Sequence, residues 1–123
     1  MAILDDVLAG LVAGLKGDLS EAGFTRQRGG LARGVAWAEA SGRAPDGAWM
    51  ELRLHHRPSE HRIQAGLLAY QPLARGGRTI VVGEQSLNYT YDADEVSHHI
   101  ADEVSRWLTQ IAEQKDDKAI GAA

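Results

Sequence analysis

The chain has 123 residues, of which 44% are hydrophobic and 24% are charged, and it contains no cysteine. These values are typical of one soluble globular domain and exclude a disordered or disulfide-stapled chain. A chain of this size can bury a sufficient core without a structural metal. The lack of cysteine excludes thiol nucleophiles, iron–sulfur clusters and cysteine-ligated zinc. It is compatible with a reducing compartment, and we expect a cytoplasmic protein.

The formal net charge of −4 conceals an uneven distribution along the sequence. Residues 24–78 carry nine arginines against four acidic residues, whereas residues 79–123 carry three basic against nine acidic residues. The first 23 residues are also acidic, with one lysine against four carboxylates. A basic middle segment therefore lies between two acidic ends.

Apolar residues of the N-terminal segment recur at helical spacing and predict one amphipathic helix that ends near Gly23. They are Ile3, Leu4, Val7, Leu8, Leu11, Val12, Leu15 and Leu19. A glycine at this place favours the left-handed conformation that ends many helices. Charged residues interrupt the apolar run, so we expect neither a signal peptide nor a membrane span.

Alternating apolar and polar residues predict strands in the middle of the chain. The first is expected over 31–40, followed by a loop over 41–47. The runs 48–57 and 62–70 predict an antiparallel hairpin in which Leu52 faces Ala65 and Leu54 faces Ile63. Residues 79–91 predict a further strand, which Gly83 could divide into two shorter ones.

A second helix is expected after Asp92, because Glu95 follows three residues later in a capping-box arrangement. We expect this helix to end near Glu113 and residues 114–123 to form a polar, disordered tail after a single domain of residues 1–113. The element order predicts an α+β two-layer sandwich. Both helices would pack on one face of an antiparallel sheet of four to five strands and leave the other face uncovered.

The Gly23-Phe24 pair that closes the first helix is followed by Arg26 and Arg28 before the first expected strand. This arrangement resembles a group of small bacterial domains with terminal helices around a sheet. Some members of that group are toxin-immunity or other partner-binding proteins. The resemblance implies a non-catalytic role and carries no catalytic motif onto this chain.

The uncovered sheet face is the first candidate site, because the alternation places cationic and aromatic side chains on it together. They are Trp49, Arg53, His55, Arg57, Arg62 and Tyr70. Arginine beside aromatic rings suits acidic protein segments, a second copy of the same sheet, or nucleic acid. The alternative is an ordinary solvated face on which Glu51 and Glu60 pair with the arginines.

Two histidines form the second candidate site. The expected hairpin register places His56 opposite His61, about 5 Å apart at Cβ, where two imidazoles could chelate a divalent metal. His98, His99 or Glu60 would have to complete the ligand set. The alternative is that these histidines lie at the sheet rim in a structural or surface role.

The sequence contains none of the common motifs of nucleophilic, phosphate-binding or metalloprotease sites. The leading hypothesis is therefore a non-catalytic binding module that uses the open sheet face for an acidic protein partner or for homodimerisation. The first alternative is a small metal-dependent or His-dependent enzyme centred on His56 and His61. The second is a single-stranded nucleic-acid binder, which the sequence pI of 5.7 disfavours.

Overall fold

The computed structural model describes residues 6–44, 47–71 and 76–121, with side chains described up to residue 113. Two short helices, α1 (Asp6–Gly14) and α2 (Lys16–Ala22), precede five strands and the long helix α3 (Asp94–Gly121). The strands are β1 (Phe24–Ala32), β2 (Val35–Arg43), β3 (Trp49–Arg57), β4 (Arg62–Tyr70) and β5 (Thr79–Asn88). A 3-10 turn, Pro58–Glu60, joins β3 to β4.

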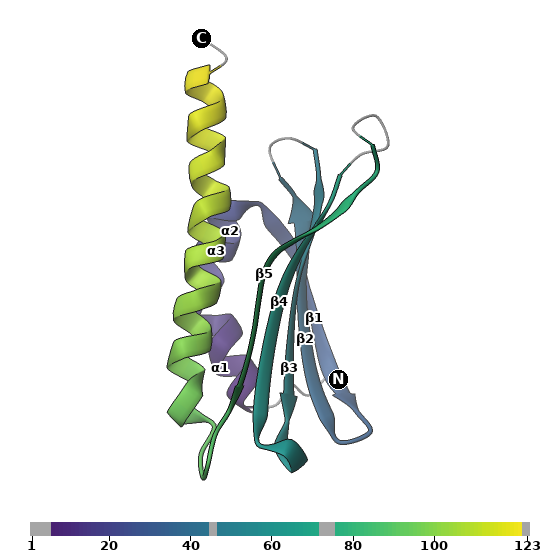
Figure 1. Cartoon of the computed structure of the whole chain (residues 1–123), viewed down its shortest axis with the longest axis vertical. Coiled ribbons are helices and arrows are strands. Elements are labelled where there is room, and N and C mark those ends of the chain that lie inside the picture. Colours follow the sequence, from purple (N-terminus) through teal and green to yellow (C-terminus); the bar gives the residue numbers. More distant parts are fainter. Residues whose placement is uncertain (1–5, 45–46, 72–75, 122–123) are drawn as a thin grey trace.

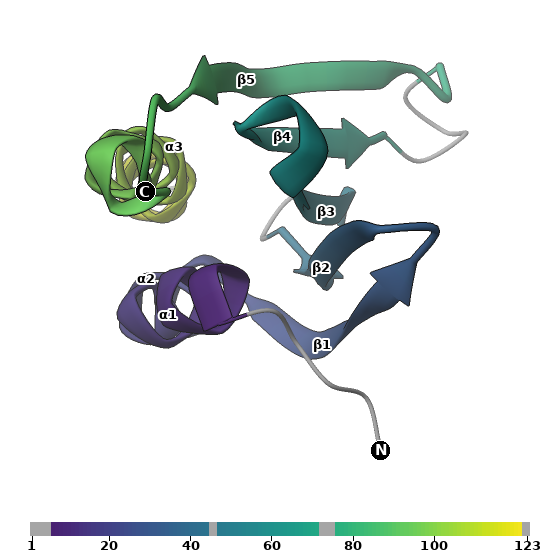
Figure 2. The same cartoon turned by 90° about the horizontal axis from the view of Figure 1, so that it is seen from below.

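The strands form one antiparallel sheet in the order β1-β2-β3-β4-β5, and the helices lie on one side of it (Figures 1 and 2). Helix α3 contacts β4 and β5, α1 contacts β2 and β3, and α2 contacts β1. The predicted α+β two-layer sandwich is confirmed, including the placement of the helices. The opposite sheet face, which we call the open face, is not covered by any described element (Figure 2).

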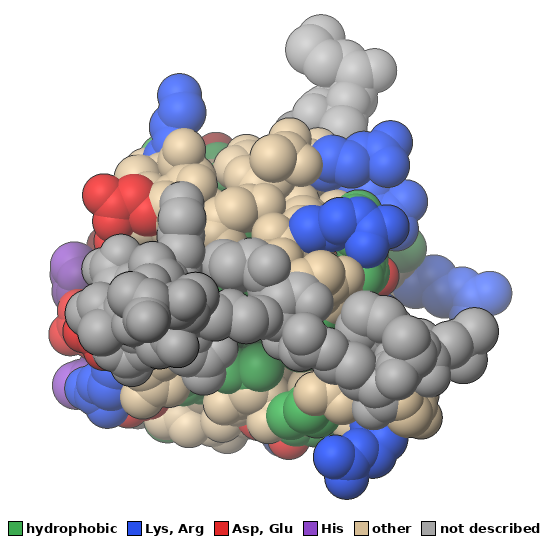
Figure 3. Space-filling view, turned by 90° about the horizontal axis from the view of Figure 1, so that it is seen from above, with side chains coloured by type: hydrophobic (Ala, Val, Ile, Leu, Met, Phe, Trp, Pro, Cys, Tyr) green, Lys and Arg blue, Asp and Glu red, His purple; other side chains and the backbone are tan. Residues whose placement is uncertain are grey.

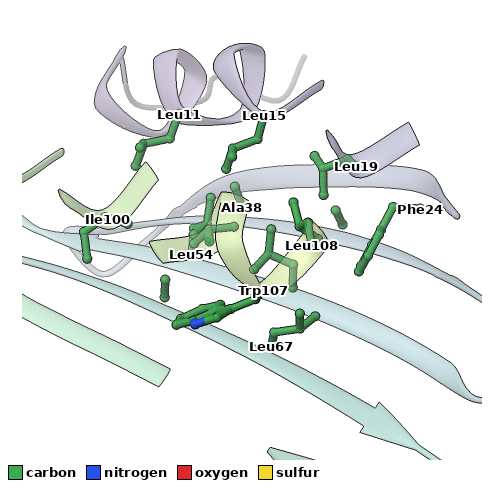
Figure 4. Packing of buried hydrophobic residues seen from close by; sticks show 14 of the residues in the cluster. Leu11, Leu15, Leu19, Phe24, Ala38, Leu54, Leu67, Ile100, Trp107 and Leu108 are labelled. Carbon is green, nitrogen blue, oxygen red and sulfur yellow. The ribbon is translucent and has the colours of Figure 1, made fainter. Parts of the chain in front are cut away.

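One hydrophobic core lies between the two layers (Figure 4). Leucines from α1 and α2 meet small residues of β2 and larger ones of β3 and β4, while α3 adds Ile100, Val104, Trp107 and Leu108. The sheet residues that contribute to this core alternate with those of the open face, as strand geometry requires. None of the described helices is long and apolar enough to cross a membrane.

The N-terminal helical segment ends as predicted but is divided at Leu15. Gly23 caps α2 in the left-handed conformation, with φ of 98°, and its N–H bonds to the carbonyls of Leu19 and Ser20. The predicted single helix is wrong in this respect. Gly14 and Gly17 flank the division, and glycine lowers helix propensity. Ile3 and Leu4 lie outside the described residues.

The first predicted strand, over 31–40, is wrong because a tight turn lies within it. Arg33 and Gly34 both have positive φ, 53° and 77°, and Ala32 pairs with Val35 across this two-residue hairpin. Such backbone angles match the right-handed twist of paired strands. The turn separates β1 from β2 and adds an edge strand, β1, that the sequence pattern did not predict. Leu31 consequently lies on the helix side of the sheet and is 59% exposed.

Strand β5 is continuous, and its predicted break at Gly83 corresponds to a bulge. Gly83 pairs with Leu67, but the next pair is Val81 with Leu68, so Val82 is the extra residue. Trp107 of α3 lies directly over Gly83, close to the buried Leu67 (Figure 4). The bulge therefore lies next to the position where the Trp107 ring of α3 packs on the backbone of β5.

The start of α3 confirms the predicted capping arrangement. The Glu95 carboxylate accepts hydrogen bonds from the backbone N–H groups of Thr90, Tyr91 and Asp92, at 3.0, 2.9 and 3.2 Å. The Asp92 carboxylate accepts one from the N–H of Asp94, at 3.0 Å. At its other end α3 extends to Gly121, beyond the end near Glu113 that the sequence predicts. No proline or glycine interrupts residues 108–120, and several are strong helix formers.

Replacing Glu95 with glutamine is expected to lower the melting temperature at neutral pH. Hydrogen bonds from the three backbone N–H groups lower the pKa of Glu95, so the ionised form stabilises the fold. This contribution is complete above the ordinary pKa of 4.5 and is lost as the pH falls through the lowered folded-state value. Thermal unfolding from neutral to acid pH should show the difference from wild type shrinking. Glu113→Gln, an exposed carboxylate on the same helix, should change little.

Candidate functional site

All six residues predicted for the open face lie on it. Trp49 pairs with Tyr70, Arg57 pairs with Arg62, and Arg53 and His55 occupy the intervening positions of β3 on the same side. The prediction of their common placement is confirmed by the register.

Glu51 of β3 holds two of the side chains on the open face through hydrogen bonds. Its carboxylate accepts a hydrogen bond from Trp49 Nε1 at 3.2 Å and from Arg53 Nη2 at 2.6 Å. The same Nη2 lies 3.3 Å from the Tyr70 hydroxyl of β4. Burial alone would raise the pKa of Glu51, but hydrogen bonds from Arg53 and Trp49 bring it below its usual value. Glu51 is therefore an ionised anchor that fixes the direction of the Arg53 side chain.

The other two arginines are held at the turn end of β3 and β4. Arg57 Nε donates to Gln64 Oε1 at 2.7 Å and lies 3.9 Å from Glu60. Arg62 Nη1 lies 3.5 Å from the other oxygen of Glu60. The alternative interpretation, in which Glu51 and Glu60 pair with these arginines, therefore describes real contacts. Partly exposed pairs of this kind contribute little to stability, but they restrict where each guanidinium points.

Arginine–tryptophan contacts extend the face toward β1 and β2. The guanidinium of Arg28 lies 5.8 Å from the Trp37 ring, and that of Arg43 lies 5.8 Å from the Trp49 ring. Arg28 also pairs with Glu39 at 3.2 Å. Trp37, Arg28 and Arg43 were not among the predicted site residues. Arg28 and Trp37 were missed because the expected strand over 31–40 concealed the β1–β2 hairpin, and Arg43 because β2 extends into the loop expected over 41–47.

A hollow of about 300 Å³ lies on the open face over β3, β4 and β5. Gly66 forms its floor, and a Cβ at this position would meet no atom within 4 Å. Arg53, His55 and Arg57 of β3 form one wall, and Glu84 of β5, which pairs with Gly66, lies on the opposite side. We call this feature the Gly66 hollow. It exists because glycine occupies a strand position that would otherwise present a side chain.

His55 lies between the two arginines of this wall. Desolvation by burial, followed by the positive charges of Arg57 and Arg53, lowers the pKa of His55 below 6.5, while Glu39 opposes the shift. The imidazole is therefore neutral at pH 7. A bound anion would offset the positive charges of the two arginines and so favour the charged imidazole.

The open face is basic and the helical side is acidic. Arginines outnumber glutamates on the strands of the open face, which carry Arg26, Arg28, Arg43, Arg53, Arg57 and Arg62 against Glu39, Glu51 and Glu84. In Figure 3 most visible Lys and Arg side chains lie toward the right, where the sheet stands, and the Asp, Glu and His side chains are seen mainly toward the left. The asymmetry along the sequence thus becomes an asymmetry between two sides of the molecule.

The predicted pairing of His56 with His61 is wrong. Leu54 pairs with Ala65, His56 pairs with Ile63, and Arg57 with Arg62 closes the hairpin. His61 belongs to the turn, where it adopts a φ of 48° and its N–H bonds to the carbonyl of Pro58. Pro58 begins the 3-10 turn and so moves the centre of the turn one position along the chain.

Both histidines contact Tyr89 instead. His56 is 5% exposed, and its Nε2 lies 2.8 Å from the Tyr89 hydroxyl. The His61 ring stacks on Tyr89 with a centroid separation of 5.1 Å. Among the described residues, no group of three or more His, Asp or Glu is arranged to hold a metal ion, so His98, His99 and Glu60 do not complete such a set.

Tyr89→Phe is expected to reduce the free energy of unfolding by about 1 kcal/mol, because it removes a hydrogen bond to a buried imidazole. Urea denaturation of wild type and variant would measure this loss. Tyr91→Phe is the matched control, since Tyr91 is 89% exposed and should tolerate the change. Equal stability of the two variants would contradict a structural role for the His56–Tyr89 contact.

Comparisons of this chain with models of protein families, with curated proteins and with solved structures find no match. The resemblance to small bacterial partner-binding domains therefore stays a prediction.

Proposed function

We propose that this chain is a non-catalytic binding module that captures an acidic protein partner on the open face of its sheet. The observation that carries the proposal is the set of cationic side chains already fixed around the Gly66 hollow. Arg53 is held by Glu51 and Tyr70, and Arg57 is held by Gln64. Side chains that are already oriented lose less conformational entropy on binding.

The arginines retain donors for a partner. Within the described part of the chain, the hydrogen bonds and ion pairs of Arg53 use Nη2, and those of Arg57 use Nε. A guanidinium has five N–H donors, so each arginine can still present N–H groups to a carboxylate. Half-buried Trp49 and Tyr70 add flat apolar area beside these charges, a combination that is frequent in protein interfaces.

Charge favours an acidic partner over a symmetric dimer or a nucleic acid. A face-to-face dimer would bring two arginine-rich surfaces together, and like charges opposed in an interface are unfavourable. Nucleic acid is disfavoured because the sequence pI is 5.7, whereas dedicated nucleic-acid-binding domains are usually basic. An acidic protein segment needs only the open face, where its carboxylates meet the arginines.

Affinity capture with the double variant Trp49→Ala/Arg53→Glu would test this proposal. We expect wild type to retain acidic proteins, identified by mass spectrometry, that the variant loses. The matched control is Tyr91→Ala/Lys16→Glu, which removes an exposed aromatic ring and reverses one positive charge outside the open face. If both double variants retain the same proteins as wild type, the open face is not the binding site.

Light scattering after size-exclusion chromatography distinguishes a homodimer from a monomer. We expect wild type to be monomeric at micromolar concentration. A wild-type dimer that Trp49→Ala/Arg53→Glu converts to a monomer would assign the open face to a second copy of this chain. That result would overturn the acidic-partner proposal.

A further inference from the structure

We propose that the Gly66 hollow binds a carboxylate group of the acidic partner and that this binding takes up a proton at His55. The inference rests on the function proposed above and specifies both the recognised group and a dependence on pH. It is carried by the placement of three cationic or protonatable side chains along one wall of a hollow with a glycine floor.

The wall that would receive the carboxylate is on β3. Arg53, His55 and Arg57 alternate along one side of this strand, so consecutive members are about 7 Å apart. A carboxylate over His55 would therefore lie within reach of both flanking guanidiniums. Glu60 of the turn and Gln64, which pairs with His55, hold Arg57, while Glu51 holds Arg53.

Glu84 would repel a bound carboxylate, so the carboxylate has to lie nearer to β3 than to β5. The row Arg53, Gly66, Glu84 crosses three neighbouring strands, which places β5 about 10 Å from β3. A carboxylate against β3 thus avoids the repulsion that it would meet near β5. Leu68 and the 57% exposed Val81 border the far end of the hollow, where they suit an apolar side chain of the partner next to the bound carboxylate's segment.

The proton would be taken up by the neutral imidazole of His55. The groups around it are Arg53 and Arg57 on its own strand, Trp37 and Glu39 on β2, Gln64 on β4 and Ser86 on β5. In the free protein desolvation by burial disfavours a positive charge on the ring, and the two arginines disfavour a third positive charge beside them. A bound carboxylate offsets them and accepts a hydrogen bond from the imidazolium, so solvent protonates the ring as the complex forms.

Nuclear magnetic resonance titration with a hexaglutamate peptide would test both parts. The peptide remains largely ionised at pH 6, since glutamate has an ordinary pKa near 4.3. We expect binding to be roughly threefold to tenfold tighter at about pH 6 than at about pH 7.5, because one proton is coupled to binding. The titration midpoint of His55 should move to higher pH in the presence of the peptide, and hexaserine should not bind.

Four variants test whether the carboxylate binds in the Gly66 hollow and whether His55 takes up the proton. Arg53→Gln should weaken hexaglutamate binding about tenfold, whereas Arg28→Gln, an equal loss of charge elsewhere on the open face, should weaken it less than about twofold. Gly66→Val should weaken binding without any change in charge, because it fills the hollow. His55→Gln should bind hexaglutamate with the same affinity at pH 6 and pH 7.5, and no more tightly than wild type binds it at pH 7.5.

The outcomes separate this inference from the proposed function. Equal weakening by Arg53→Gln and Arg28→Gln would overturn the hollow as the site. Binding that depends on Arg53 but not on pH would overturn the proton uptake. If hexaglutamate does not bind while capture of an acidic protein still requires Trp49 and Arg53, the carboxylate site is wrong and the proposed function stands.

Discussion

Gly83→Ala is expected to reduce the free energy of unfolding by about 2 to 3 kcal/mol, although it adds one methyl group. An ideal Cβ at Gly83 would lie 2.2 Å from Cε2 of Trp107 and 2.3 Å from Cδ2. The ring cannot move aside cheaply, because Trp107 is only 7% exposed and packs within the core. Helix α3 or strand β5 would have to shift instead.

Urea denaturation would measure this effect, with Gly66→Ala as the matched control. Gly66 lies on the neighbouring strand β4, but its added Cβ would point into the open hollow and meet nothing within 4 Å. Gly66→Ala should leave stability unchanged or raise it slightly, because alanine restricts the unfolded chain more than glycine does. If Gly83→Ala were as stable as Gly66→Ala, the close approach of Trp107 to β5 would be contradicted.

The contrast between these two glycines illustrates what the sequence could predict. Alternation along β3 and β4 placed Trp49, Arg53 and Tyr70 on one face, because this pattern follows directly from strand geometry. The same pattern could not distinguish Gly66, which leaves a hollow, from Gly83, which accommodates a ring from α3. That difference depends on which residues of a distant helix pack against each strand.

The missed turn between β1 and β2 and the wrong register of the β3–β4 hairpin both have a local origin. Two-residue turns are usually recognised by Asn-Gly or Asp-Gly, and Arg33-Gly34 lacks this signal. In the β3–β4 hairpin the apolar alternation fits two pairings that differ by two residues, since both keep Leu52 and Leu54 on the core face. Pro58 and the left-handed His61 select one of them, which moves His61 from a strand into the turn.

Gly42→Ala is expected to destabilise the protein more than Gly83→Ala does. A Cβ at Gly42 would lie 2.0 Å from the carbonyl oxygen of Gly23 and 2.8 Å from the Cα of Phe24. Both neighbours are backbone atoms of the junction between α2 and β1, where Phe24 pairs with Gly42. No side chain can rotate to relieve the overlap, so the junction itself must move.

We expect Gly42→Ala to cost about 3 kcal/mol or more, or to prevent stable folding. A loss of this size corresponds to a fall of roughly 10 °C in melting temperature for a domain of this length. Ser41→Ala, at the adjacent open-face position of β2, is the control and should change stability by less than about 0.5 kcal/mol. Thermal unfolding of the two variants measures the difference. A Gly42→Ala protein with the melting temperature of wild type would contradict the pairing of Phe24 with Gly42 at the start of β1. The position of the edge strand β1, which places Arg28 beside Trp37, would then also be wrong.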